Sequence, residues 1–250
     1  MEQKRKQFQG VLNILSFNRH YYVFGLTALL VLFISRILFH LPHIIFWPVT
    51  IAILYGLIMP LIVSAYVYDF SGYYNLDWLN KIIDKSQKPS LIVNINAGFD
   101  ETSFLIKDRF QQVDLKVFDF YNASQHTEPA IKRARNVSLV YPNTQQISSG
   151  NIPLKENSAD IIFLLSAAHE IRSNEEKVLF LKECCRICKP GGQVIMVEHL
   201  RNIPNFLAFS VGFTHFFSRS TWKKAFNVSG FSSFQENKFT PFMSVFNCSH

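Results

Sequence analysis

The chain has 250 residues, 48% of them hydrophobic, and carries a formal net charge of +7. This length accommodates one domain of ordinary size with an additional segment, and the chain contains no internal repeat or low-complexity run. The positive charge does not indicate a nucleic-acid-binding protein. Much of it lies in an N-terminal arm beside an apolar segment, where anionic membrane lipid is the simpler partner.

Two long apolar segments follow the arm, Tyr21–Phe39 and Ile44–Val67. At about 1.5 Å per residue, each can cross a hydrocarbon core about 30 Å thick. The alternatives are two buried helices of a soluble bundle and a cleaved signal peptide. The first is disfavoured because neither segment has a polar face, and the second because one long apolar segment directly follows the other. The sequence therefore predicts a transmembrane helical hairpin over 21–67.

Basic residues predict the orientation of this hairpin. Lys4, Arg5, Lys6 and Arg19 precede or flank the first apolar segment, whereas the connecting loop 40–43 contains neither Lys nor Arg. Because basic residues are retained on the cytoplasmic side of a membrane, both chain ends should lie there. We expect a multi-pass membrane protein with two spans, a basic cytoplasmic arm over 1–20, and a C-terminal domain facing the cytoplasm.

Residues 68–89 form an aromatic-rich linker that ends in a polar stretch containing a proline. Two interpretations are open for its aromatic part. It is either a belt at the membrane interface or a cover that folds over a cofactor pocket in the following domain. The polar stretch marks the domain boundary, so the second domain is expected over 90–250.

That domain alternates short apolar strands with amphipathic helices, which predicts a doubly wound, mostly parallel, seven-stranded Rossmann-like sheet with right-handed crossovers. Ser173 and Glu176 have the spacing of a capping box and should begin a helix. Lys189-Pro190-Gly191-Gly192 should end this helix and form the turn into the next strand. Strands are expected over 91–95, 117–120, 137–141, 161–165, 194–197, 234–239 and 242–246, and helices over 101–110, 127–135, 173–188 and 220–227.

The cysteines do not predict a metal site. Cys185 and Cys188 have C-x-x-C spacing, and Cys184 and Cys248 complete the set. A zinc site would need a second ligand pair, and the sequence contains no matching C-x-x-C or H-x-x-x-H. We interpret the four as small buried hydrophobic residues in a reducing compartment and expect no bound metal.

Ligands of such sheets bind at the carboxyl ends of the strands. Gly98 lies in the turn after the first strand, and Asp119 follows it by 21 positions (119 − 98) at the end of the second. A glycine lets the backbone approach a ligand, and an acid about 20 residues later can accept hydrogen bonds from ribose hydroxyls. This pairing has the place and the chemistry of a nucleotide-type site.

Four motifs in order resemble those of class I S-adenosylmethionine-dependent methyltransferases, over about residues 90–246. The turn 94–98 resembles the family's Gly-rich first motif, and 117–119 resembles its second-strand acid. The stretch 152–160 resembles the loop into the fourth strand, and 189–192 resembles the turn before the fifth.

This resemblance implies S-adenosylmethionine as the cofactor, with a binding site formed by Asn94, Asn96, Gly98, Asp119, Gln146 and Ser166. The family usually has an acid and three glycines where this chain has Asn94, Asn96, Gly98 and Asp100. An alternative hypothesis follows from that difference, namely a catalytically inactive binding or assembly module at the membrane.

His169 follows the fourth strand, and Glu198 and His199 follow the fifth, so we expect all three at one cleft as catalytic or acceptor-contacting residues. Histidine is the usual base near neutral pH. The alternatives are a helix-start or buried structural role for His169, and a Glu198 that orients His199 or pairs with Arg201.

The aromatic segment Asn205–Phe217 is either a core helix or an element that faces the membrane and covers the substrate. The second interpretation, together with a membrane anchor, predicts a lipophilic small-molecule substrate taken from the bilayer. The functional hypothesis is therefore a membrane-anchored methyltransferase that methylates oxygen, sulfur or carbon of such a molecule.

Overall fold

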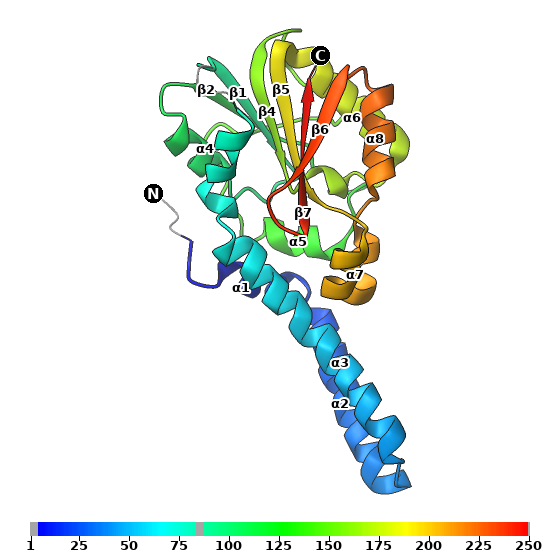
Figure 1. Ribbon diagram of the computed structural model, residues 1–250. Coiled ribbons are helices and arrows are strands. Elements are labelled where there is room, and N and C mark those ends of the chain that lie inside the picture. The colour runs from blue at the N-terminus through cyan, green and yellow to red at the C-terminus, as the bar shows by residue number, and fades with distance from the viewer. Residues whose placement is uncertain (1–4, 84–87, 250) are drawn as a thin grey trace.

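The computed structural model describes residues 5–83 and 88–249, and its centre is a seven-stranded sheet with the order β3-β2-β1-β4-β5-β7-β6 (Figure 1). Strands β1 to β5 pair in parallel, whereas β7 runs antiparallel to both β5 and β6. This confirms the predicted Rossmann-like sheet. The strands are β1 (Leu91–Asn96), β2 (Asp114–Asp119), β3 (Gln145–Gln146), β4 (Ala159–Leu165), β5 (Cys188–His199), β6 (Ser233–Lys238) and β7 (Met243–Ser249).

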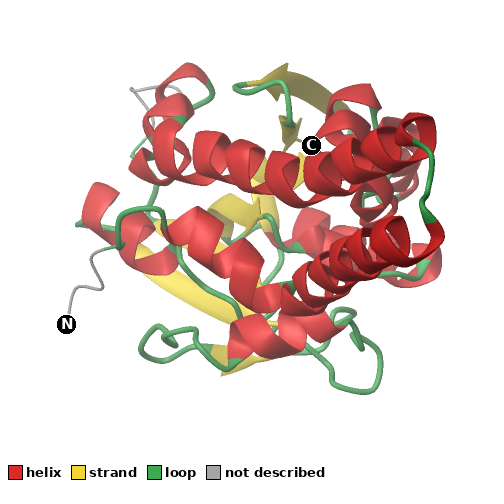
Figure 2. Cartoon of the chain, turned by 90° about the horizontal axis from the view of Figure 1, so that it is seen from below, coloured by secondary structure: helices red, strands yellow, loops and turns green. Residues whose placement is uncertain are grey.

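Helices cover both faces of the sheet (Figures 1 and 2). One core layer contains side chains of α1, α5, α6 and α8, and the other contains side chains of α3, α4 and α7 with the short helices η1 to η3. The helices are α1 (Gln9–Phe17), α2 (Arg19–Phe39), α3 (His43–Ser64), η1 (Ala65–Phe70), η2 (Tyr73–Asn75), η3 (Asp77–Lys81), α4 (Ser103–Arg109), α5 (Pro129–Arg135), η4 (Ala168–Glu170), α6 (Asn174–Ile187), α7 (Ile203–Phe209), η5 (Ser210–His215) and α8 (Arg219–Val228).

Ser173 caps the start of α6 as predicted, since its Oγ accepts a hydrogen bond from the Glu176 amide at 3.3 Å. The Glu176 side chain does not complete the capping box, because its Oε1 accepts from Ser149 Oγ at 2.7 Å. The turn predicted at 189–192 is instead an irregularity at the start of β5. Cys188 already pairs with Ala159, and the register shifts before the next pair. A Cβ at Gly192 would lie 2.9 Å from the Asp160 carbonyl oxygen, so only glycine allows this close approach.

The third strand was predicted in the wrong place. Residues 137–141 are not a strand, and β3 is the short pair Gln145–Gln146, which lies beside Phe118 and Asp119. Val140 is 73% exposed, so its β-branched side chain packs against no neighbouring strand. Strand propensity reflects a fit to a half-buried pleated surface, and 137–141 has no such surface to join.

The hairpin α2–α3 projects from one end of the domain (Figure 1). The helices Arg19–Phe39 and His43–Asn75 are long and apolar enough to cross a membrane, by length and composition. Core helices of soluble proteins and signal sequences share those two properties. In this chain the most apolar windows are 0% and 6% buried, which distinguishes them from core helices. Lys4, which contributed to the predicted orientation, lies outside the described residues.

The linker after the hairpin packs onto the domain. Tyr73, Trp78 and Leu79 are buried in the core layer that also contains Val67 of η1. The Tyr73 and Trp78 rings stack on Phe239. Residues 84–87 of the predicted boundary lie outside the described part of the chain, and the exact domain division stays a prediction.

All four cysteine side chains are buried, and burial raises the pKa of each thiol, that of Cys188 to about 12. Thiols with raised pKa values stay protonated and unreactive near neutral pH. This agrees with their interpretation as small buried hydrophobic residues.

Asp160 connects three strands at the amino-terminal edge of the sheet. Its Oδ2 accepts hydrogen bonds from the Ser90 and Leu91 amides at 2.8 and 2.9 Å, and its Oδ1 pairs with Lys189 Nζ at 2.7 Å. Burial opposes ionisation, but the hydrogen bonds from Lys189, Leu91 and Ser90 outweigh it and lower the pKa of Asp160 to about 2.

Replacing Asp160 with Asn should lower the thermal midpoint of the detergent-solubilised chain, because charge-assisted hydrogen bonds of this kind contribute about 1–2 kcal/mol each. Since the folded-state pKa is depressed, the wild type should lose this contribution as pH falls from about 4 towards 2, and the variant should not. The control is Asp114→Asn, whose partner Lys116 is exposed. Equal thermal midpoints for Asp160→Asn and Asp114→Asn would contradict a stabilising role of the Asp160 carboxylate.

Candidate functional site

Gly98 and Asp119 lie together at the carboxyl ends of β1 and β2. Asn96 pairs in register with Asp119, and the chain then turns at Gly98 with φ +79°. A Cβ at Gly98 would lie 1.4 Å from Nη1 of Arg135 and 2.8 Å from Asp119 Oδ2. The backbone conformation therefore favours glycine, and in this structure the guanidinium of Arg135 occupies the space beside it.

Arg135, which sequence reasoning missed, lies between these two residues. Its Nη1 donates to Asp119 Oδ2 at 2.7 Å and to the Ala97 carbonyl at 3.1 Å. The guanidinium lies 4.1 Å from the centre of the Tyr121 ring. The only signal in the sequence was a basic residue in the last turn of the helix that follows Asp119.

The two asparagines of the first motif have different partners. Asn94 Nδ2 donates to Thr102 Oγ1 at 3.1 Å and to Ser103 Oγ at 2.8 Å, so this side chain fixes the start of α4. Asn96 Oδ1 accepts from the Gly98 amide at 2.7 Å. Its Nδ2 is buried and has no partner, although the residue is only 5% exposed. Asn96 thus retains a donor for a ligand, whereas the described donors of Asn94 are already used.

A cavity of about 360 Å³ lies directly after Asp119, at the carboxyl ends of β2 and β3. Gln146 lines it and donates through Nε2 to the Tyr121 carbonyl at 2.7 Å. The other lining residues include Phe120, Tyr121, Ile147 and Ser148. Gln146 therefore lines a cavity at the edge of the sheet, and its role in cofactor binding stays a prediction.

The N-terminal helix α1 covers the same edge. The Phe17 and Phe99 rings are 5.2 Å apart in an edge-to-face contact, directly after Gly98. Arg133 donates to the Phe17 carbonyl and, at 2.9 Å, contacts His20 Nδ1. The sequence did not predict that the basic arm would pack on the sheet domain, because neither residue of this contact belongs to a motif.

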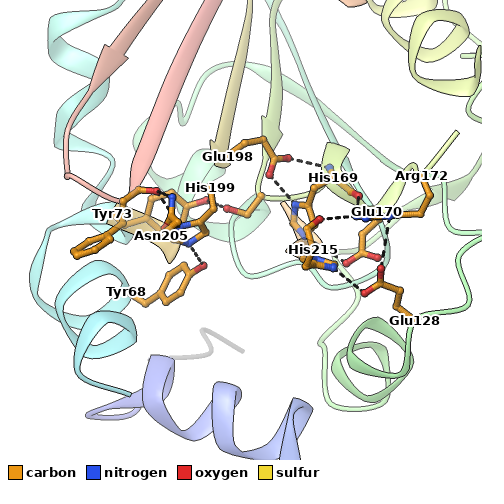
Figure 3. Close-up of polar contacts among 12 residues, drawn as sticks. Tyr68, Tyr73, Glu128, His169, Glu170, Arg172, Glu198, His199, Asn205 and His215 are labelled. Carbon is orange, nitrogen blue, oxygen red and sulfur yellow. Dashed lines mark hydrogen bonds and ion pairs between the residues drawn. The ribbon is translucent and has the colours of Figure 1, made fainter. Parts of the chain in front are cut away.

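His169 and Glu198 meet at the carboxyl ends of β4 and β5 (Figure 3). His169 Nδ1 donates to Glu198 Oε2 at 2.7 Å, and the His169 amide donates to Oε1 at 3.1 Å. Glu198 is fully buried. Burial alone would lower the pKa of His169, but Glu198 and Glu170 outweigh it and raise the pKa to about 10. The predicted proximity of His169 and Glu198 is therefore present in the structure.

Three more polar side chains extend this cluster. His169 Nε2 lies 3.4 Å from Glu170 Oε1, and His215 Nδ1 donates to Glu128 Oε2 at 2.7 Å. The hydrogen bond from His215 lowers the pKa of Glu128 although burial opposes the shift. The contact of His215 with Glu128 links segments 87 positions apart (215 − 128), which no sequence motif indicates.

His199 lies on the other face of β5 (Figure 3). Successive side chains of a strand point to opposite faces, so the expectation that Glu198 and His199 share one cleft is wrong. His199 Nδ1 donates to the Phe242 carbonyl at 3.0 Å, and Nε2 accepts from the Tyr68 hydroxyl at 2.8 Å. Burial lowers the pKa of His199 to about 4, although hydrogen bonds to Asn205 and Phe242 favour protonation. His199 is therefore a neutral imidazole near pH 7.

Ser166, at the end of β4, contacts the aromatic linker 68–89. It has a positive φ of 53°, and its Oγ lies 3.2 Å from the Tyr73 hydroxyl. A non-glycine residue in this conformation is uncommon and clusters at functional sites. The structure thus places Ser166 beside the linker, at the carboxyl edge where its cofactor role was predicted.

Comparisons with known proteins agree with this geometry. Residues 112–196 match a family model described as a methyltransferase domain. Human N-acetylserotonin methyltransferase, solved in complex with S-adenosylmethionine, superposes with a TM-score of 0.50 at 14% identity, covering 78% of this chain and 55% of that protein. A SAM-dependent methyltransferase from Aquifex aeolicus has a TM-score of 0.50 at 14% identity, covering 76% of this chain and 97% of that one.

No curated protein matches the chain significantly. The chain spans little more than half of the human enzyme. At these identities the structural likeness concerns the fold, which is that of class I methyltransferases. Together with the family-model match, this likeness supports a relationship of the chain to class I methyltransferases.

Replacing His199 with Gln should reduce the acid sensitivity of the fold. A histidine with a depressed folded-state pKa contributes fully above about 6.5, and its contribution is lost as pH falls towards about 4, because the unfolded chain takes up the proton first. From the cited pKa, the wild type should lose about 2 kcal/mol more than the variant between about pH 7 and pH 5. Thermal midpoints against pH measure this, with the exposed His40→Gln as control. Parallel profiles for wild type and His199→Gln would contradict a buried neutral His199.

Proposed function

We propose that this chain is an S-adenosylmethionine-dependent methyltransferase that is anchored in a membrane by α2 and α3 and methylates a small lipophilic acceptor at oxygen, sulfur or carbon. The observation that carries the proposal is the contact of Gly98 with Asp119 beside a cavity, within a sheet of the class I methyltransferase topology. A family-model match to a methyltransferase domain covers residues 112–196 and supports it.

The residues at the cofactor edge fit this cofactor. Asn96 has a buried amide nitrogen without a partner, and Gly98 leaves room beside Asp119 that the Arg135 guanidinium now occupies. Asp119 can accept hydrogen bonds from ribose hydroxyls, and Gln146 lines the neighbouring cavity. Arg135 must then leave or share the Asp119 carboxylate that it now contacts. When bound, the cofactor supplies an electrophilic methyl group on a sulfonium ion.

We assign the acceptor to the carboxyl ends of β4 and β5. Glu198 fixes the ring and the backbone of His169, so it is a positioning residue. His169 lies only partly buried at the edge and is the side chain placed to contact the acceptor. His199 lies on the other face of β5 and its Nε2 already accepts from the Tyr68 hydroxyl, so we give this pair no part in proton transfer from the acceptor.

An exposed apolar surface supports a lipophilic acceptor. Ile203, Phe206 and Leu207 of α7 and Val211 of η5 are about half exposed or more, with Val211 at 77%. This surface adjoins the hairpin, since the Tyr55 hydroxyl of α3 donates to the Leu207 carbonyl at 2.8 Å. An apolar patch beside a membrane anchor favours contact with the bilayer, from which a hydrophobic substrate can enter.

The membrane topology in this proposal is a two-span hairpin with the sheet domain in the cytoplasm. Arg5, Lys6 and Arg19 precede the first span, whereas the hairpin loop has neither Lys nor Arg. Lipid is therefore the second partner of the chain, through both the spans and the basic arm.

A specific observation favours a second candidate function, an inactive methyltransferase-like module. Asn94 is committed to α4, and Arg135 already neutralises Asp119. In this alternative the ion pair replaces the cofactor contact and the domain serves as a membrane-anchored binding or assembly module.

Titration of the purified full-length chain with S-adenosylhomocysteine separates the two. We expect saturable binding that Asp119→Ala weakens by about 10- to 100-fold, because hydrogen bonds to a charged group contribute about 1.5–3 kcal/mol. Arg135→Ala should bind severalfold more tightly, since the carboxylate is then free. Asp114→Ala, at the exposed start of the same strand, is the matched control. Absence of saturable binding in the folded wild type would favour the inactive module, and an unaffected Asp119→Ala would show that Asp119 is not in the site.

Adding charge to the α7–η5 surface should reduce methyl transfer to the acceptor without changing cofactor binding. The double variant Ile203→Lys/Val211→Lys should keep its affinity for S-adenosylhomocysteine but transfer at least about tenfold less radiolabelled methyl into a lipid extract of the host membrane, because a lysine at an apolar membrane contact costs about 2–3 kcal/mol.

Leu179→Lys, on the exposed side of α6, is the control for a surface lysine. Both variants should stay in the membrane after a carbonate wash, since the hairpin is unchanged. Label recovered only in the water-soluble fraction would overturn the lipophilic acceptor, and release of wild-type protein by carbonate would overturn the membrane spans.

A further inference from the structure

A group of metal-ligand type side chains lies at the carboxyl ends of β4 and β5 (Figure 3). His169 and Glu170 come from η4, and His215 ends η5. One potential ligand atom of each lies within 4.8 Å of the others. The proposed methyltransferase activity does not account for this convergence, because Glu170 and His215 have no role in it.

Both imidazoles are oriented in the way that metal-bound histidines are. His169 Nδ1 donates to Glu198, and His215 Nδ1 donates to Glu128, each at 2.7 Å. A carboxylate on one ring nitrogen fixes the tautomer and makes the other nitrogen a better ligand. In both rings the nitrogen left for a ligand is therefore Nε2.

The approach of His169 to Glu170 leaves a position for a cation. His169 Nε2 faces Glu170 Oε1 at 3.4 Å, and either a proton on Nε2 or a metal ion can lie between these two atoms. The other oxygen, Glu170 Oε2, is buried and has no hydrogen-bond partner, although the residue is only 7% exposed. A buried carboxylate oxygen without a partner is costly and points to a missing ligand.

The formal charges of the surrounding side chains also favour a bound cation. Three carboxylates, Glu128, Glu170 and Glu198, surround the two imidazoles, and the guanidinium of Arg172 lies 3.6 Å from Glu128. The three carboxylates and the guanidinium sum to a formal charge of −2 (−3 + 1) before any charge on the imidazoles is counted, which favours a cation in the cluster.

We propose that His169 Nε2, Glu170 and His215 Nε2 bind a divalent first-row transition-metal ion of the zinc type, with Glu198 and Glu128 as the supporting hydrogen-bond acceptors. Two imidazoles and one carboxylate form the donor set of open zinc sites and of two-histidine, one-carboxylate iron sites, whereas Mg²⁺ prefers oxygen ligands alone. Three protein ligands leave a position for an oxygen of water or of a small molecule.

The distances fit after a small contraction. Ligand atoms about 2.1 Å from a tetrahedral ion lie about 3.4 Å apart, and His169 Nε2 and Glu170 Oε1 already have that separation. All three ligand atoms lie within 4.8 Å of one another, so no pair has to close by more than about 1.4 Å. Two of the ligands lie in the short helix η4 and the third at the end of η5, so the contraction does not have to move a strand.

The experiment uses the full-length chain in detergent, stripped with EDTA and then titrated with Zn²⁺ or Co²⁺. We expect one equivalent of metal per chain after gel filtration, a visible Co²⁺ absorption typical of low coordination number, and a higher thermal midpoint with Zn²⁺. Millimolar Mg²⁺ should do none of these. None of the readouts depends on methyl transfer, so a failure of the proposed function leaves this test intact.

His215→Ala should lower the affinity for Zn²⁺ by at least about 100-fold, and Glu128→Gln, which keeps all three ligands, by about 10- to 100-fold. The matched control is His126→Ala, since His126 is also buried and lies 3.4 Å from a carboxylate, Glu176, outside the cluster. Circular dichroism shows whether each stripped variant is folded. If His215→Ala does not fold, Glu128→Gln still tests the proposal.

Two results would overturn the proposal. Absence of stoichiometric metal in the folded wild type would assign the positive charge to a proton on His169. Binding that His215→Ala and Glu128→Gln leave unchanged, or a Co²⁺ complex with intense near-ultraviolet thiolate bands, would place the ion on the cysteines of α6 instead.

Discussion

The buried carboxylate of Glu198 is the constraint on which the carboxyl edge of the sheet depends. A fully buried charge is costly unless it is paired, and here both oxygens are used by the ring and the amide of His169. That pairing fixes η4 against the end of β5. Because side chains alternate along a strand, it also directs the next residue, His199, to the other face. One strand end therefore serves an ionic cluster on one face and a neutral histidine among aromatic rings on the other.

The apolar hairpin α2–α3 is continuous with that second face. Helix α3 runs on through η1, where Val67 is part of the core and Tyr68 donates its hydroxyl to His199. Tyr73 of η2 then reaches Ser166 at the end of β4. The segment that leaves the hairpin thus forms one wall of the edge where we place the acceptor. This arrangement brings the hairpin, the apolar surface of α7 and the proposed acceptor-binding residues into one connected region.

Local patterns in the sequence predicted most elements because local forces form them. The helix predicted over 173–188 is observed at 174–187, since its capping serine and its apolar spacing act within a few residues. The fourth strand was readable as an apolar run because both of its faces are buried. The third strand was not readable, because its pairing with β2 depends on a neighbour distant in the chain and its two residues are glutamines.

The sequence by itself determined the class of fold, the apolar hairpin, and the positions of Gly98, Asp119, His169 and Glu198 at strand ends. These follow from periodicity, turn residues and motif order, which are properties of contiguous segments. Only the tertiary structure decided what those residues contact: Arg135 on Asp119, Asn94 on the start of α4, and His215 with Glu128 beside Glu170. Side chains from separate segments converge only when the sheet and its helices pack, and no spacing in a single segment encodes the distance between them.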